Sequence, residues 1–270
     1  MSKKNYFMES RNESFRLDLK TEFSEIEKPV LWAGLKPGMR VLDVGCGIGK
    51  TTYFLKHIAG KDSHVVGIDL SEERLLYARE HYKGAGIEFE RRDIYSQLDD
   101  LGRFDFIWVR FFLEYYKQKS FELVKTLTEL LTDFGILCLG DLDHNGLNHF
   151  DIPDRCMRAI YGCARALEES ADFDPYAGRK LYSYLYDLGF REIDVRLDAH
   201  HLIFGELDSV DAYNWFTKLS VAGKNSGYSF DEYPGGFEEF FKECKDFFYN
   251  PRRFTYTPLI TCRGVKPTGL

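Results

Sequence analysis

The stretch Val41–Thr52, VLDVGCGIGKTT, decides the fold of this 270-residue chain. An apolar run that is typical of a buried β-strand leads into a turn with three glycines, and a helix-forming segment follows. Glycine has no Cβ, so Gly45, Gly47 and Gly49 let the backbone approach a bound ligand closely. The stretch therefore predicts a ligand-binding turn between a strand and a helix of an α/β sheet.

A second buried strand, His64–Asp69, ends in a carboxylate twenty-four residues after Gly45. In a parallel sheet this position allows Asp69 to accept hydrogen bonds from a ribose diol. The glycine spacing is G-x-G-x-G, whereas dinucleotide-binding turns have G-x-G-x-x-G. Asp43, at the end of the first strand, would repel a diphosphate and attract an ammonium or sulfonium group. These features together predict a ligand that carries a nucleoside and a positive charge.

At these residues the chain resembles the class I S-adenosylmethionine (SAM)-dependent methyltransferases, whose motif D-x-G-x-G-x-G matches Asp43, Gly45, Gly47 and Gly49. The resemblance implies SAM as the cofactor and S-adenosylhomocysteine as the product, and it extends over roughly 145 residues. It also implies an α/β fold with a doubly wound, seven-stranded mixed sheet in the order 3-2-1-4-5-7-6. In that fold the last strand is antiparallel, helices cover both faces of the sheet, and an inserted helical cap is expected.

Further residues around the cofactor follow from the same resemblance. Asp93 is expected to face the adenine amino group, and Ile94 to pack on the ring. Arg110 and Phe111 follow the fourth strand, beside the transferred methyl group. The remaining residues expected to bind the cofactor are Cys46, Thr51, Leu70 and Arg74.

The resemblance also gives an N-terminal arm that folds over the cofactor. Tyr6 is expected near the methionine end of SAM, and Arg16 near its carboxylate, which suits the fork of a guanidinium group. The predicted units are an arm and helix (1–35), a SAM-binding core (36–145), cap helices with strand six (146–250) and a final antiparallel strand (251–270).

The other elements are predicted from hydrophobic periodicity, capping residues and turn residues. The expected helices are 21–35, 120–131, 151–170, 178–188, 209–222 and 237–248, with a further helix that begins at Ser71–Arg74. The expected later strands are 87–90, 104–109, 135–140, 191–197 and 254–262. The aromatic residues of 228–256 form the core stripe of the last helix in one interpretation, and Tyr228 and Tyr233 line an acceptor pocket in another.

Catalysis needs few protein groups, because SAM carries its own leaving group and in-line displacement depends on alignment and on exclusion of water. A base is needed only for an acceptor that must lose a proton. His144 follows the fifth strand and is the first candidate. The pair His200–His201 is expected further from the methyl site. The other candidates are His149, Glu114, Tyr115 and Asp141.

Composition limits the class of substrate and the cellular compartment that the sequence predicts. A net charge of −7 argues against nucleic acid, and Arg110–Leu113 stands where amino-methylating nucleic-acid enzymes have an Asn/Asp-Pro-Pro-Tyr/Phe motif. The six cysteines include no C-x-x-C pair, so neither a zinc site nor a disulfide framework is indicated, and no cluster has metal-ligand spacing. No stretch has the length of a signal peptide or a membrane span. We therefore expect a cytoplasmic protein with a small-molecule acceptor; the oligomeric state is open, with a homodimer as one candidate.

Three functions are compatible with the sequence. The first is a SAM-dependent methyltransferase that acts on O, N or C of a small molecule. The second is a SAM-binding protein without transferase activity or with a protein substrate, because cofactor motifs and catalysis are separable. The third is an NAD-dependent oxidoreductase, which the glycine spacing and Asp43 argue against.

Overall fold

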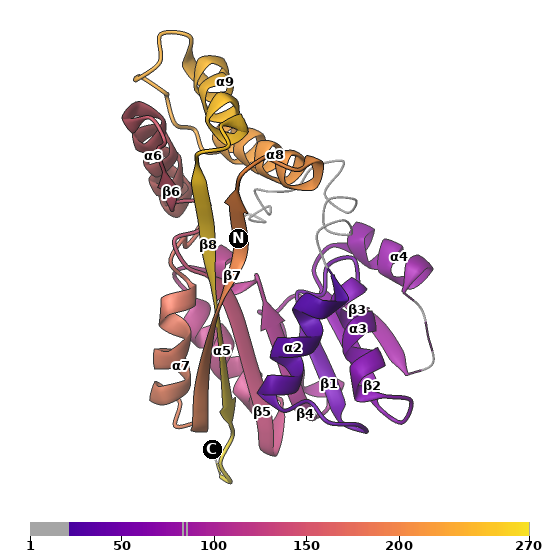
Figure 1. Ribbon diagram of the computed structural model, residues 1–270. Coiled ribbons are helices and arrows are strands. Elements are labelled where there is room, and N and C mark those ends of the chain that lie inside the picture. The colour runs from indigo at the N-terminus through magenta and orange to yellow at the C-terminus, as the bar shows by residue number, and fades with distance from the viewer. Residues whose placement is uncertain (1–21, 83, 85, 270) are drawn as a thin grey trace.

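The computed structural model describes residues 22–82, 84 and 86–269, and Figure 1 shows a central sheet with helices around it. The strands are β1 (Arg40–Val44), β2 (His64–Asp69), β3 (Ile87–Arg91), β4 (Phe104–Arg110), β5 (Leu131–Leu142), β6 (His149–Phe150), β7 (Arg191–Phe204) and β8 (Phe254–Val265). The α-helices are α2 (Phe23–Ala33), α3 (Lys50–Ala59), α4 (Glu72–His81), α5 (Ser120–Glu129), α6 (Asp154–Ser170), α7 (Leu181–Asp187), α8 (Ser209–Asn225) and α9 (Gly236–Tyr249). Short 3₁₀ turns occur at Asp99–Leu101, Leu113–Tyr115 and Gly178–Lys180.

The strand order confirms the predicted topology, with one correction. The order is β3-β2-β1-β4-β5-β8, and β7 pairs with the other edge of β8. β1 to β5 are parallel to one another, and β8 is antiparallel to both β5 and β7. The predicted number of seven strands is wrong, because the described residues form an eight-stranded sheet. The extra strand, β6, has only two residues, and its pairing with β8 could not be read from local sequence.

Two apolar layers cover the sheet because alternate residues of each strand point to opposite faces. On one face Leu42 and Val44 pack in a cluster that includes residues of α5 and α7. On the other face Val41 packs in a cluster with residues of α2 and α3. Every residue of β1 except Arg40 is buried, as expected for a central parallel strand.

The cap is built on an extension of the last two strands. β7 continues to Phe204, beyond the predicted end at Leu197, because β8 offers partners up to the pair Phe204 and Phe254. Figure 1 shows β7 and β8 reaching beyond the rest of the sheet to α6, α8 and α9. These helices have their own apolar clusters, in which residues such as Phe240 and Phe248 are buried. All six cysteines are buried and free, which confirms that they pack as small apolar residues.

Candidate active site

One continuous cavity of about 1460 Å³ lies at the carboxyl ends of β1, β2 and β4 and extends beneath the cap. Open α/β sheets bind their ligands at this edge. We call the part lined by the ends of β1 to β4 and the loops that follow them the strand-end half. We call the part lined by α6, α8, α9, the loop after β5 and the loop after α6 the cap half. The two halves differ in chemistry and are described in turn.

The glycine turn forms the floor of the strand-end half. Gly45, Gly47 and Gly49 all have positive φ angles, of 70°, 54° and 83°, which glycine adopts without a steric penalty. The amides of Gly45 and Cys46 both donate to the carbonyl oxygen of Ile68, at 2.8 and 3.0 Å. These bonds fix the turn against the end of β2, where the second acidic residue lies.

Asp69 joins the glycine turn to the start of α4. One carboxylate oxygen accepts a hydrogen bond from the amide of Gly47 at 2.9 Å. The other accepts from the amide of Ser71 at 2.8 Å and from Nη2 of Arg74 at 3.2 Å. A carboxylate has about four acceptor positions, so this side chain, which lines the cavity, retains capacity for a ligand hydroxyl.

Asp43 is a buried acid beneath the turn. It accepts a hydrogen bond from Oγ1 of Thr52 at 2.7 Å. Burial raises the pKa of this carboxyl to about 7. The hydrogen bond from Thr52 lowers the pKa, and the negative charge of Asp69 raises it further. A cation bound above Asp43 would favour the ionised form.

Arg110 places a positive charge in the same half of the cavity, at the end of β4. Burial lowers the pKa of its guanidinium to about 10, so the group still carries its charge at neutral pH. Its Nη2 atom lies 3.9 Å from Oε2 of Glu25, and the guanidinium stacks on the Phe111 ring at 4.2 Å. Its Nε atom is buried and has no hydrogen-bond partner among the described residues. Arg110 therefore brings a positive charge to the wall of the cavity.

A chain of three polar side chains crosses the boundary between the two halves. Nδ2 of Asn145 donates to Oε2 of Glu114 at 2.6 Å, and Oδ1 of Asn145 accepts from the ammonium of Lys218. All three residues line the cavity. Behind them, Asp141 accepts a hydrogen bond from the amide of Glu114 at 3.1 Å, and burial, with the charge of Glu114, raises the pKa of Asp141 well above its ordinary value.

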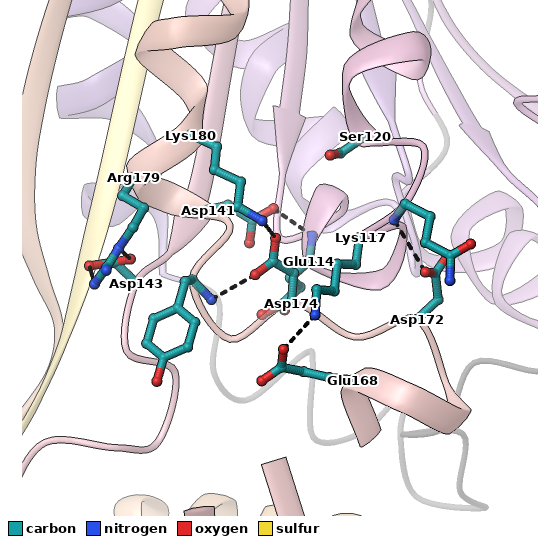
Figure 2. A network of polar contacts seen from close by, with 12 residues as sticks. Glu114, Lys117, Ser120, Asp141, Asp143, Glu168, Asp172, Asp174, Arg179 and Lys180 are labelled. Atoms are coloured by element: carbon teal, nitrogen blue, oxygen red, sulfur yellow. Dashed lines mark hydrogen bonds and ion pairs between the residues drawn. The ribbon is translucent and has the colours of Figure 1, made fainter. Parts of the chain in front are cut away.

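Figure 2 shows the polar contacts that hold the loop after β4 against the loop after α6. Lys117 forms an ion pair with Glu168 of α6 at 2.5 Å, and the amide of Gln118 donates to Asp172. The amide of Asp174 donates to the carbonyl oxygen of Glu114 at 2.7 Å. These contacts fix the position of Glu114, because its loop is tied to the cap as well as to the sheet.

Most of the residues predicted around the cofactor meet in the strand-end half. Those that line the cavity are Asp43, Gly45, Cys46, Gly47, Thr51, Asp69, Leu70, Arg74, Asp93, Ile94, Arg110 and Phe111. Gly49 does not line it; a Cβ there would lie 2.6 Å from the Cβ of Ala78, so this glycine allows α3 and α4 to pack closely. Tyr6 and Arg16 lie outside the described residues.

The histidines are placed differently from the sequence expectation. His144 does not line the cavity, and its ring packs edge-on against Tyr176 at 5.1 Å. His149 contacts Thr255 and the carbonyl oxygen of Gly146, and burial lowers its pKa to about 4. His200 was expected far from the site, yet it lines the cavity with its ring 4.7 Å from that of Phe111. The greater length of β7 brings it there, and no local signal in the sequence gives that length.

The loop tyrosines are also placed away from the cavity. Tyr233 is buried and donates a hydrogen bond to Glu243, and neither it nor Tyr228 lines the cavity. Phe240 does line it, and Phe247 and Phe248 are buried on the same helix. The interpretation of the last helix as a core stripe is therefore confirmed.

Comparison with known proteins identifies the family. Residues 35–172, just over half of the chain, match the family model described as "Methyltransferase domain". The chain belongs to this methyltransferase domain family. It is 27% identical over 224 residues to phosphoethanolamine N-methyltransferase 1 of Arabidopsis thaliana, and the aligned region covers 78% of this chain and 40% of that protein. It is 29% identical over 194 residues to juvenile hormone acid O-methyltransferase of Bombyx mori, which covers 67% of this chain and 68% of that protein.

Solved structures show the same fold. Phosphoethanolamine N-methyltransferase 2 of Haemonchus contortus, with phosphomonomethylethanolamine and S-adenosylhomocysteine, has a TM-score of 0.62 over 99% of this chain and 61% of that chain, at 14% identity. The first plant phosphoethanolamine N-methyltransferases that the chain matches are longer proteins, and it spans 15% to 40% of their length. The predicted α/β methyltransferase fold is thereby confirmed.

No described helix is both long and apolar enough to cross a bilayer. No group of three or more His, Cys, Asp or Glu side chains among the described residues could hold a metal ion. The cytoplasmic location, the exclusion of nucleic acid and the homodimer stay predictions from the sequence.

Proposed function

We propose that this protein is a SAM-dependent methyltransferase that transfers a methyl group to O, N or C of a small-molecule acceptor by in-line displacement. The observation that carries the proposal is the continuity of the cavity, in which Asp69 and the glycine turn share one space with a separate cap half. A site for one ligand alone would not need the second half. The units proposed for these roles are residues 36–145 for the cofactor and 146–250 for the acceptor, with the arm 1–35 over the cofactor and 251–270 completing the sheet.

The residues of the strand-end half fit SAM chemically. Asp69 would accept a hydrogen bond from a ribose hydroxyl through its remaining acceptor position, and Ile94 would pack on the adenine beside Asp93. The buried carboxyl of Asp43 is suited to the positive charge of the cofactor, and the guanidinium of Arg110, which lines the cavity, to its carboxylate. When bound, SAM supplies an activated methyl group with its own leaving group.

The protein contributes alignment, exclusion of water and, for some acceptors, a proton acceptor. We place that last role on Glu114 rather than on His144, because Glu114 lines the cavity at the boundary between its halves. The hydrogen bond from Asn145 and the backbone contact with Asp174 hold it in place. For an acceptor that needs no deprotonation, Glu114 would instead orient a polar group.

The test is S-adenosylhomocysteine binding to the wild type and to Asp69→Ala. Loss of the carboxylate removes the ribose contact and loosens the glycine turn through the lost bonds to Gly47 and Ser71. At about 1.5 to 3 kcal/mol for each hydrogen bond to a charged group, we expect affinity to fall at least about a hundredfold. The matched control is Asp62→Ala, an exposed aspartate before β2, which should bind as the wild type does. Unchanged affinity in folded Asp69→Ala would contradict the placement.

A further inference from the structure

The walls of the cap half are apolar on three helices. The side chains that face it include Leu147, Ile160, Ala164, Leu167, Leu219 and Phe240. They come from α6, α8, α9 and the loop after β5. A ligand with an apolar body gains free energy here by leaving water, at roughly 25 cal/mol for each Å² of apolar surface buried.

The charged residues of the cap half do not suit a phosphate group. Lys218 supplies a positive charge, but its ammonium bonds to Asn145 and lies 5.4 Å from the centroid of the Trp215 ring. Glu114 stands on the other side of the same asparagine. Asp172, which also lines the cavity, adds a second carboxylate. A phosphate dianion at this polar chain would thus meet Lys218 with the carboxylate of Glu114 beside it, whereas phosphate sites present several basic or amide donors.

The size of the cavity leaves room for such an acceptor beside the cofactor. Sites for single drug-sized ligands measure about 300 to 1,000 Å³, and this cavity measures about 1460 Å³. The cap half lies on the far side of the polar chain formed by Glu114, Asn145 and Lys218 from the glycine turn. A molecule in the cap half can therefore present one polar end to Glu114 while its body stays among apolar side chains.

We propose, on the basis of the proposed function, that the methyl acceptor is a lipophilic molecule with a single nucleophilic oxygen or nitrogen. Its apolar body lies between α6, α8 and α9, and its polar end lies at the chain of Glu114, Asn145 and Lys218. Phosphoethanolamine, the substrate named for several relatives, is the contrasting acceptor, since it has no apolar body and carries a phosphate. Apolar burial then determines which molecules enter the cap half.

The experiment titrates protein saturated with S-adenosylhomocysteine with the neutral fluorescent probe N-phenyl-1-naphthylamine. We expect the wild type to bind the probe, 1-decanol to displace it, and phosphoethanolamine to leave it bound. Ala164→Phe fills the cap half with a ring that occupies the space of the probe, and it should weaken probe binding at least about tenfold. The matched control is Ala166→Phe, the same substitution on α6 at a position that does not line the cavity, which should change affinity less than about twofold.

Each outcome decides the inference. Three results would overturn it while leaving the cofactor assignment intact. They are equal probe affinity in Ala164→Phe and the wild type, displacement of the probe by phosphoethanolamine, and no probe binding to protein that holds S-adenosylhomocysteine. Failure to bind S-adenosylhomocysteine at all would instead remove the proposed function beneath it. If Ala164→Phe does not fold, Ala222→Phe on α8 makes the same test from the opposite wall, because Ala222 also lines the cavity.

Discussion

The two halves of the cavity are built by different kinds of sequence. The strand-end half comes largely from one glycine turn and two strand ends within residues 43–74, and backbone amides hold both the turn and the carboxylate of Asp69 in place. The cap half comes from three helices and two loops spread over residues 142–240, and its walls are apolar. In the proposed function, a cofactor recognised by local backbone geometry and an acceptor recognised by assembled apolar surface would meet in one space. A sequence motif thus determines the strand-end half, whereas tertiary packing between distant segments determines the cap half.

The largest effect on the free energy of unfolding should come from Asp43→Asn. The effect should depend on pH and should leave the cap half unchanged. Because burial raises the folded-state pKa of Asp43 from 3.8 to about 7, the folded protein loses stability as pH rises from about 4 to about 7. The variant removes that loss, so we expect its free energy of unfolding at pH 8 to exceed that of the wild type by on the order of 4 kcal/mol. Urea unfolding at pH 4 and pH 8 measures this.

The same variant should bind SAM more weakly at pH 8, because it lacks the negative charge beneath the cofactor, while binding of N-phenyl-1-naphthylamine in the cap half stays unchanged. Equal stability of the two proteins at pH 8 would contradict the raised pKa of Asp43. A loss of probe binding in the variant would show that Asp43 also affects the cap half.

The next effect concerns backbone geometry at the two ends of α3. Gly49 and Gly60 both have positive φ, of 83° and 81°, but a Cβ at Gly60 meets nothing within 4 Å. Gly60→Ala should cost about 1 to 3 kcal/mol from backbone strain alone, because its ψ of 179° lies in a region that is essentially restricted to glycine. Gly49 has a ψ of 0°, in the left-handed region where strain costs about 1 to 2 kcal/mol. Gly49→Ala should cost about 2 kcal/mol in addition, because its Cβ would collide with Ala78 and Phe89. Thermal and urea unfolding measure both losses, and a loss of no more than about 2 kcal/mol in Gly49→Ala would refute the packing role assigned to Gly49.

A smaller effect is expected at the boundary between the halves. Asn145→Ala removes the hydrogen bonds to Glu114 and Lys218 and should lower stability by about 2 kcal/mol. S-adenosylhomocysteine affinity should stay within about twofold of the wild type, since Asn145 lies on the cap side. Asn148→Ala is the matched control, because its Nδ2 has no partner among the described residues. A large loss of S-adenosylhomocysteine binding in Asn145→Ala would mean that the two halves are coupled.

The smallest effect tests the contact between the β4 loop and the cap. Lys117 and Glu168 have side chains 37% and 23% exposed, and ion pairs of this kind contribute about 0.5 kcal/mol. Lys117→Met should lose about that much in 50 mM salt and less in 1 M salt, where charges are screened. Lys125→Met, at an exposed position of α5, is the control. A loss of stability well above 1 kcal/mol in Lys117→Met would mean that this ion pair contributes more to the attachment of the cap than a surface pair does.

The sequence predicted the strand-end half well because its residues are close along the chain. The glycine motif, the acid after β2 and the order of the strands were all predicted, and twelve of the predicted residues line the cavity. The first candidate base, His144, does not line the cavity, since its direction depends on a turn with positive φ and on its contact with Tyr176. Glu114, another of the candidate bases, does line it. The sequence did not predict the position of His200, nor that Asn145 and Lys218 form a polar chain with Glu114. Those positions depend on strand length and on packing between distant segments, which no local pattern encodes.

The most direct test of the central claim is a calorimetric titration of the purified protein with S-adenosylhomocysteine, paired with NADH. We expect micromolar binding of S-adenosylhomocysteine and no heat from NADH, because the G-x-G-x-G turn suits a nucleoside and Asp43 favours its ammonium group and repels a diphosphate. Binding of NADH, or of neither compound, would contradict the assignment of the strand-end half to SAM.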